Sequence, residues 1–362
     1  MGYINANLLN NLQSDSATNE ARRGELGLID AVLGSTPAVT FLRPSDRAAL
    51  REISSQRKVE VPYMLDQEVE VRTGPSFNIP ANLETTDKLA YQAYDVFSGF
   101  RHYKASYANN QIDQDFAIRQ KILNINYKMA QKIEEIFQTI LELRKTQKLD
   151  FTLQASHDGT INFDTGTDTL QVDLPAQKST MFFALQRLME ANDIGGDYRL
   201  ITSRGGLIRQ MAEAMKYGAA NDKNLNALGF LPQDRIHETG TVSAGSDIFN
   251  GYMFKNGSIG AIENFPWDFV NGTKTADGRE WSISDMAMPF TNMKANIFTN
   301  SQPTDATALI KLVDNKPDSN LQMTAFEEMA IWHRFYVVFE PNSDLENRVN
   351  TVIKLKGLNS TI

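Results

Sequence analysis

The chain has 362 residues, and 44 Asp and Glu against 36 Lys and Arg give it a formal net charge of −8. It has no cysteine, which excludes disulfides, zinc–thiolate sites and thiol nucleophiles together. The acidic balance excludes a surface built as a whole to condense on phosphate. The sequence contains no run of about 18 apolar residues, which a membrane span would need. Its start, "MGYINANLLNNLQ", lacks the features of a secretory signal, so we expect the protein to be cytoplasmic when made.

Residues 1–57 are polar and rich in Asn and Arg, with only short apolar patches such as "LGLIDAVL". Such a composition cannot bury enough apolar surface to offset the entropy of ordering. We therefore predict an N-terminal arm without a core of its own, which orders only on neighbouring molecules.

Alternating apolar and charged residues follow the arm. The apolar positions are Val59 and Val61, and then Val69 and Val71. The turn signal "TGP" comes next, and "DKLAYQAYDVFSGFRHYKASYANN" supplies a return limb. The pattern predicts a long β-hairpin, although a two-sided sheet in the core is also compatible with it.

The strongest periodicity lies in the stretch that the return limb enters. Its apolar residues alternate steps of four and three, at Ile118, Ile122, Ile125, Met129, Ile133, Ile136, Ile140 and Leu143. Asn110 is a suitable N-cap, and a helix from about Asp113 to Thr146 would span roughly 50 Å. One interpretation is a coiled-coil seam or an ordinary core helix. The other is a spine on which a thin, extended molecule is built.

The remainder of the chain mixes short strands with helices. "FTLQASHDGTINFDTGTDTLQVDLP" predicts short strands, and "KSTMFFALQRLMEAND", "GDYRLITS" and "SRGGLIRQMAEAMKYGAA" predict a helix, a strand and a helix. "KNGS" predicts a hairpin turn between two Gly-rich strands. "WSISDMAMPFTNMKANIF" and "TAFEEMAIWHRFYVVFEP" alternate as strands that would close a sheet.

Residues with catalytic potential form no recognisable motif. The four histidines have no metal-ligand spacing: His102, His157, His237 and His333. The glycines of "TSRGGLIRQ" favour a tight strand-to-helix turn over an anion cradle built with Arg204. We predict no catalytic, cofactor or metal site, and an enzyme with an unrecognised carboxylate-based site stays open as an alternative.

Three stretches carry a resemblance to a known family: "KASYANNQIDQDFAIRQKILNINYKMAQKIEEIF", "GDYRLITSRGGLIRQMAEAMKYG" and "NGYMFKNGSIGAIEN". In the order arm, hairpin, long helix, α/β unit and returning sheet, the chain resembles the major capsid proteins of tailed bacteriophages. That fold is shared with encapsulins and with the capsid floor of herpesviruses.

The resemblance implies an α+β capsid fold with five segments. They are an N-arm (1–57), an extension loop (58–108), a peripheral domain with the spine helix (109–178), an axial domain (179–284) and a peripheral return (285–362). Lys58 and Lys88 lie in the extension loop, where some relatives form a crosslink, but neither has a recognisable context for one.

The implied function is a non-enzymatic shell subunit. Hexamers and pentamers would form an icosahedral or prolate capsid that encloses double-stranded DNA without reading its sequence. No long charged helix precedes the arm, so a separate scaffolding protein is expected, together with portal and decoration proteins. The expected location is the virion, assembled in the host cytoplasm without a membrane. An encapsulin-like compartment is the other shell that the resemblance leaves open.

Overall fold

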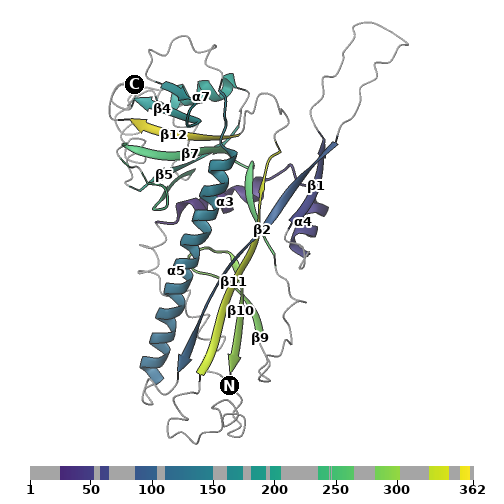
Figure 1. The fold of residues 1–362 in the computed structure, drawn as a ribbon, viewed down its shortest axis with the longest axis vertical. Coiled ribbons are helices and arrows are strands. Elements are labelled where there is room, and N and C mark those ends of the chain that lie inside the picture. The colour runs from purple at the N-terminus through teal and green to yellow at the C-terminus, as the bar shows by residue number, and fades with distance from the viewer. Residues whose placement is uncertain are drawn as a thin grey trace, which may run out of the picture.

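The computed structural model describes residues 25–52, 58–64, 86–103, 111–149, 161–173, 181–192, 196–204, 235–243, 245, 247–264, 282–301, 326–341 and 351–358. Within these ranges a long helix lies along one sheet, and a second sheet lies beside one end of that helix (Figure 1). The mixed α+β class predicted from the sequence is confirmed.

The described helices are α3 (Gly27–Ser35), the 3-10 helix η2 (Thr36–Ala38), α4 (Pro44–Glu52), α5 (Gln111–Arg144) and α7 (Met181–Ala191). The described strands are β1 (Lys58–Met64), β2 (Thr86–Tyr103), β3 (Ile161–Asp164), β4 (Thr169–Asp173), β5 (Tyr198–Ser203), β6 (Ile236–Thr239), β7 (Phe249–Lys255), β8 (Ile259–Glu263), β9 (Ser282–Ala287), β10 (Lys294–Ser301), β11 (Phe326–Phe339) and β12 (Val352–Leu358).

The first sheet has the order β1-β2-β11-β10-β9, with β8 beside β11. All its pairings are antiparallel, and the long strands β2 and β11 place Trp332 opposite Phe97 and Phe335 opposite Tyr94. Because side chains alternate between faces, Ile331 and Phe335 both point into the core that the sheet shares with α5. The sheet predicted from the C-terminal alternation is therefore confirmed.

The second sheet has the order β3-β4-β12-β7-β5-β6. The pairs β4/β12 and β5/β6 are parallel, and the other pairs are antiparallel. It has its own apolar core, to which α7 contributes Leu185, Leu188 and Met189. The strand and helix expected in this part are confirmed as β5 and α7. Each sheet draws strands from several of the five expected segments, so that division stays a prediction.

Helix α5 has 34 residues, close to the predicted length. Its predicted stripe is only one flank of the buried face, because Ile136 is half buried and Leu143 is 75% exposed. Four apolar residues of the described part of α5 that lie outside the stripe are buried as well: Leu123, Ala130, Phe137 and Leu141. The helix contacts β2 on one side and α3 on another, so two packing partners widen the buried arc beyond a single seam.

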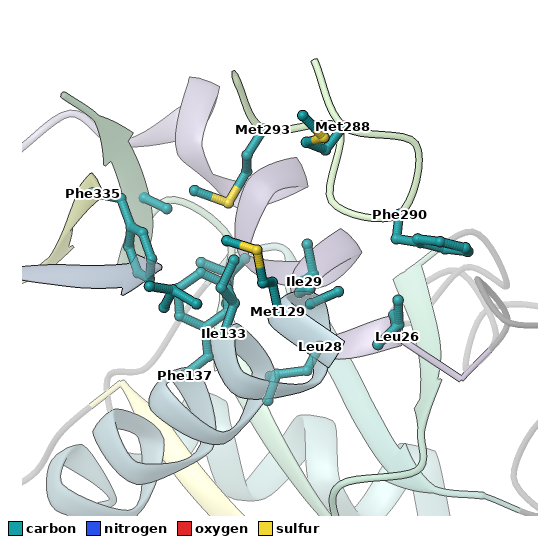
Figure 2. Close-up of a cluster of buried hydrophobic side chains, with 14 of the residues drawn as sticks. Leu26, Leu28, Ile29, Met129, Ile133, Phe137, Met288, Phe290, Met293 and Phe335 are labelled. Atoms are coloured by element: carbon teal, nitrogen blue, oxygen red, sulfur yellow. The ribbon is translucent and has the colours of Figure 1, made fainter. Parts of the chain in front are cut away.

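The segment from α3 to α4 corrects the expectation of an arm without core contacts. Leu28, Ile29 and Val32 of α3 are fully buried against α5 in the main core (Figure 2). Leu50 of α4 is buried in another cluster, with Val61 of β1. The short apolar patches were too brief to predict a core helix alone, but α5 and the first sheet supply the surfaces that bury them.

The turn between β7 and β8 corrects a second expectation. The amide of Ser258 donates to the Lys255 carbonyl at 3.1 Å, so the "KNGS" turn exists. Gly257 has a φ of +87°, and a Cβ there would lie 2.3 Å from the Ala38 carbonyl oxygen. The flanking strands do not form a hairpin, however, because β7 joins the second sheet and β8 joins the first. The turn is thus a crossing point between the sheets.

Some expectations fall outside the described residues. They are the Asn110 N-cap, the strand with Val69 and Val71 and its turn, the helix expected after Arg204, and His157.

Candidate assembly surface

Three of the four histidines considered as ligands, His102, His237 and His333, fall in the described ranges. His102 and His333 are buried in the first sheet, and burial lowers the pKa of His333 to about 4. The His237 ring lies 3.3 Å from the Arg199 guanidinium. Within the described ranges, no group of three or more His, Asp or Glu could hold a metal ion. No helix of the described part is long and apolar enough to cross a membrane.

Glu134 is a buried carboxylate at the junction of α5 with α3 and the end of β6. Its Oε1 accepts the amides of Leu28 (2.9 Å) and Ile29 (3.3 Å), in the first turn of α3. Its Oε2 accepts the hydroxyls of Thr239 (2.5 Å) and Thr241 (2.7 Å). Leu26, the N-cap of α3, provides no side-chain cap. Glu134 therefore performs that role from a different helix, where the positive end of the α3 dipole favours a carboxylate.

Burial raises the pKa of Glu134, and its four hydrogen bonds oppose that rise. Every described partner is a donor, so the site is built for an acceptor. The group is thus a structural polar centre, buried because three segments converge on it.

Glu25 closes the same junction from the residue before Leu26. Its Oε2 accepts the Tyr127 hydroxyl at 2.5 Å, and its Oε1 lies 2.8 Å from the Arg204 guanidinium. Arg204, considered above as an anion-binding residue, thus already has a carboxylate partner within the chain.

Glu142 joins the C-terminal end of α5 to the second sheet. It accepts hydrogen bonds from Lys145 (2.7 Å), Lys354 of β12 (2.9 Å) and the Tyr252 hydroxyl of β7 (2.7 Å). Burial opposes ionisation of Glu142, but these donors outweigh it and lower the pKa to about 2. Helix α5 therefore contacts the second sheet through carboxylates as well as through the main apolar core, which it shares with both sheets.

The C-terminal end of α3 is tied to the second sheet as well. Arg199 of β5 donates to the Gly34 carbonyl and to the Asn256 side chain, both at 2.9 Å. The Gly257 amide donates to the Ser35 hydroxyl at 2.7 Å. With Glu134 and Glu142, these bonds fix α3 and α5 to each other and to the second sheet.

The β1–β2 pair extends away from α5 in Figure 1. Its register runs from Lys58 opposite Gln92 to Met64 opposite Thr86. The strand pair predicted at the base of the hairpin is confirmed by this register. Val59, Val61 and Tyr91 of the pair are buried in the cluster that also holds Leu50 of α4.

The face of the first sheet opposite α5 carries exposed aromatic surface on β2. Phe97 is 66% exposed, and its cross-strand partner Trp332 is half buried. The Trp332 ring stacks on Phe298 with centroids 6.0 Å apart, and its Nε1 donates to Asp95 at 3.0 Å. Arg334 lies 3.6 Å from the same carboxylate. This outer strip combines an exposed ring with fixed charges, which is typical of contact surfaces.

Comparisons with known proteins return solved phage structures. No family model matches the sequence, and no curated protein matches it. One similar structure is the capsid asymmetric unit of cyanophage A-1(L). The match covers 93% of this chain and 94% of the cyanophage chain, at 11% identity and a TM-score of 0.47. The capsid of cyanophage P-SCSP1u covers 86% of each chain, at 10% identity and a TM-score of 0.43.

A third similar structure is the capsid of Myoviridae phage XM1. The match covers 85% of this chain and 88% of the XM1 chain, at 11% identity and a TM-score of 0.40. Because these TM-scores lie below 0.5, the likeness carries no functional argument by itself. The proposed function rests on the geometry of this chain.

Proposed function

We propose that this chain is the major capsid protein of a tailed bacteriophage, which assembles as hexamers and pentamers into a shell around double-stranded DNA. The observation that carries the proposal is the arrangement around α5. A helix of 34 residues holds two sheets together and is preceded in the chain by a β-pair that extends from the body. The resemblance of the sequence to capsid proteins was based on the same order of elements.

The internal contacts support a structural role. Among the described side chains of α5, Glu134 and Glu142 have shifted pKa values, and each has several donors from other elements. A catalytic carboxylate needs access to substrate, whereas the oxygens of these two carboxylates accept hydrogen bonds that join α5 to other elements. We therefore propose a non-enzymatic function.

The proposal extends to partners and location. A separate scaffolding protein would guide closure, and portal and decoration proteins would complete a virion assembled in the host cytoplasm. The N-arm, extension loop, peripheral domain, axial domain and peripheral return retain the boundaries given above, except that residues 26–50 act as part of the body.

Contact with DNA is proposed to be independent of sequence. The net charge of −8 gives no general gain from counterion release. Free subunits should bind neither a defined site nor random duplex with high affinity. A nanomolar, salt-sensitive preference for one site would contradict this part of the proposal.

The proposed function is tested by the assembly state of the purified protein. Sedimentation velocity and negative-stain microscopy at increasing concentration, with and without a co-expressed scaffolding protein, should show rings of five or six subunits and closed shells. A strictly monomeric protein under all of these conditions would refute the proposal.

A further inference from the structure

The solvent-facing side of α5 carries a basic stripe, which we define as Lys121, Lys128 and Lys132. All three side chains are exposed, and the stripe lies opposite the side of the helix that buries Phe137. Steps of seven and four residues place the three lysines within about 40° of one another around the helix axis. The helical rise spreads them over roughly 16 Å along that axis. The stripe is therefore a straight row of ammonium groups on one helix.

The stripe is a basic surface in an acidic chain. The sequence between Asp115 and Glu134 contains no Asp or Glu, whereas the whole chain has a net charge of −8. Asn124 and Gln131 share this side of the helix with the lysines, and both are uncharged. The next exposed side chain along the same side is Glu135. The charge of the whole chain thus conceals a cationic face that is about three helical turns long.

The contacts of the three lysines leave their ammonium groups at the surface. Lys128 donates to the Gln131 side chain at 3.0 Å, an exposed contact. Lys132 donates to Glu135 at 2.6 Å, and its side chain is 64% exposed. The Lys121 ammonium lies 5.8 Å from the centre of an aromatic ring of β2. An ammonium group has three donors, and exposed ion pairs are weak, so each lysine can also contact an external anion.

Duplex DNA is the partner whose charge pattern matches this stripe. Its phosphates follow one another about every 3.4 Å along each strand, as a continuous row of negative charge. A row of ammonium groups roughly 16 Å long therefore spans several consecutive phosphates. Each lysine has a flexible four-carbon stem and acts as a point charge, so the stripe can follow the backbone without reading bases.

We propose that the basic stripe of α5 is the surface with which each subunit contacts the phosphate backbone of the enclosed duplex DNA. The inference rests on the proposed shell function, to which it adds the face of the subunit that is turned toward the DNA. Three lysines give only a weak contact in one subunit. Many subunits around one DNA molecule repeat it, and the repeated contacts act together.

The test is binding of the purified, unassembled protein to a fluorescent duplex of random sequence, measured by anisotropy at increasing salt. Each neutralised phosphate contributes about −0.9 to the slope of log affinity against log salt concentration. Three lysines predict a slope of about −2.7, so the affinity should fall about 80-fold between about 10 and 50 mM salt. No detectable binding at the lower salt concentration would overturn the proposal.

Two triple variants separate the position of the charges from their number. The stripe variant should lose most of the binding and most of the salt dependence; it combines Lys121→Gln, Lys128→Gln and Lys132→Gln. The control variant removes three exposed lysines outside the stripe and should keep the slope; it combines Lys88→Gln, Lys148→Gln and Lys294→Gln. Glu135→Gln should raise the affinity several-fold, because it removes the carboxylate that pairs with Lys132.

The outcomes also separate this inference from the proposed function, when the assembly of each variant is followed by negative-stain microscopy. Normal shells from a stripe variant that has lost DNA binding would support the proposal. Equal losses of binding in the stripe and control variants would overturn it, since only total charge would then matter. Failed assembly of the stripe variant with unchanged DNA binding would overturn it as well, and would assign the lysines to a contact between subunits. Stripe-dependent DNA binding by a protein that never assembles would support the DNA-binding surface and count against the shell function.

Discussion

Replacement of Glu134 by alanine is the sharpest test of how the body of the subunit is held together. The substitution removes the acceptor for two amides of α3 and for two threonine hydroxyls at the end of β6. Helix α3 would then begin with buried donors that have lost their partner. We expect α3 and the β6 end to separate from α5 before the rest of the body unfolds.

The magnitude follows from the groups left without an acceptor. Each buried unsatisfied donor costs about 1–3 kcal/mol, and loss of an N-terminal cap costs about 0.5–2 kcal/mol. Removing a carboxylate from a buried site recovers part of this loss, because its desolvation cost disappears. The net decrease in the free energy of unfolding should be on the order of 3 kcal/mol. Glu134→Gln keeps one acceptor oxygen for the α3 amides and should lose only about 1 kcal/mol.

The assay is urea unfolding of unassembled subunits at neutral pH, followed by circular dichroism. Glu135→Ala is the matched control, since Glu135 is the next residue and its contact with Lys132, at 2.6 Å, is exposed. An exposed pair of this kind contributes about 0.5 kcal/mol or less. If Glu134→Ala and Glu135→Ala destabilised the subunit equally, or if Glu134→Gln were as harmful as Glu134→Ala, the assigned role of Glu134 would be wrong.

Four further predictions concern the core and its titratable groups. Ile133→Asp should prevent soluble folding, because an unpaired carboxylate would lie in the buried face of α5, whereas Gln131→Asp should be tolerated; equal solubility of the two would contradict the assigned face. A chain that starts at Lys58 should lose its cooperative melt in calorimetry, because it lacks the buried apolar residues of α3, each worth about 1.5–3 kcal/mol. The pKa of His333 is about 4 in the folded protein and 6.5 in the unfolded chain, so the unfolded chain binds the proton first as the pH drops. The free energy of unfolding should therefore fall by on the order of 3 kcal/mol between pH 6.5 and pH 4. His333→Leu should remove this dependence in urea unfolding measured over the same pH range. The pKa of Glu142 is lowered from 4.5 to about 2, so its contribution should be present above pH 4.5 and lost as the pH falls towards 2; Glu142→Gln should remove that dependence, and an unchanged acid profile would contradict the assignment.

The sequence by itself determined the features that depend on neighbouring residues in the chain. Periodic apolar residues predicted α5 because a helix places residues three and four apart on one face. Alternation predicted β1, β2 and β11 for the equivalent reason in strands. The histidines showed no metal spacing, and the absence of cysteine could be read directly from the composition.

Only the tertiary structure decided which elements meet. The α3 segment looked too short and too polar in context to enter a core, yet α5 buries it and Glu134 caps it from a position 106 residues away from Leu28. Glu134 and Glu135 are indistinguishable in the sequence, but one is buried among four donors and the other is exposed. The "KNGS" turn was predictable from its residues, whereas the departure of β7 and β8 into different sheets was not. Turn geometry is set by four residues, while strand pairing is set by partners far along the chain, whose contacts no local pattern records.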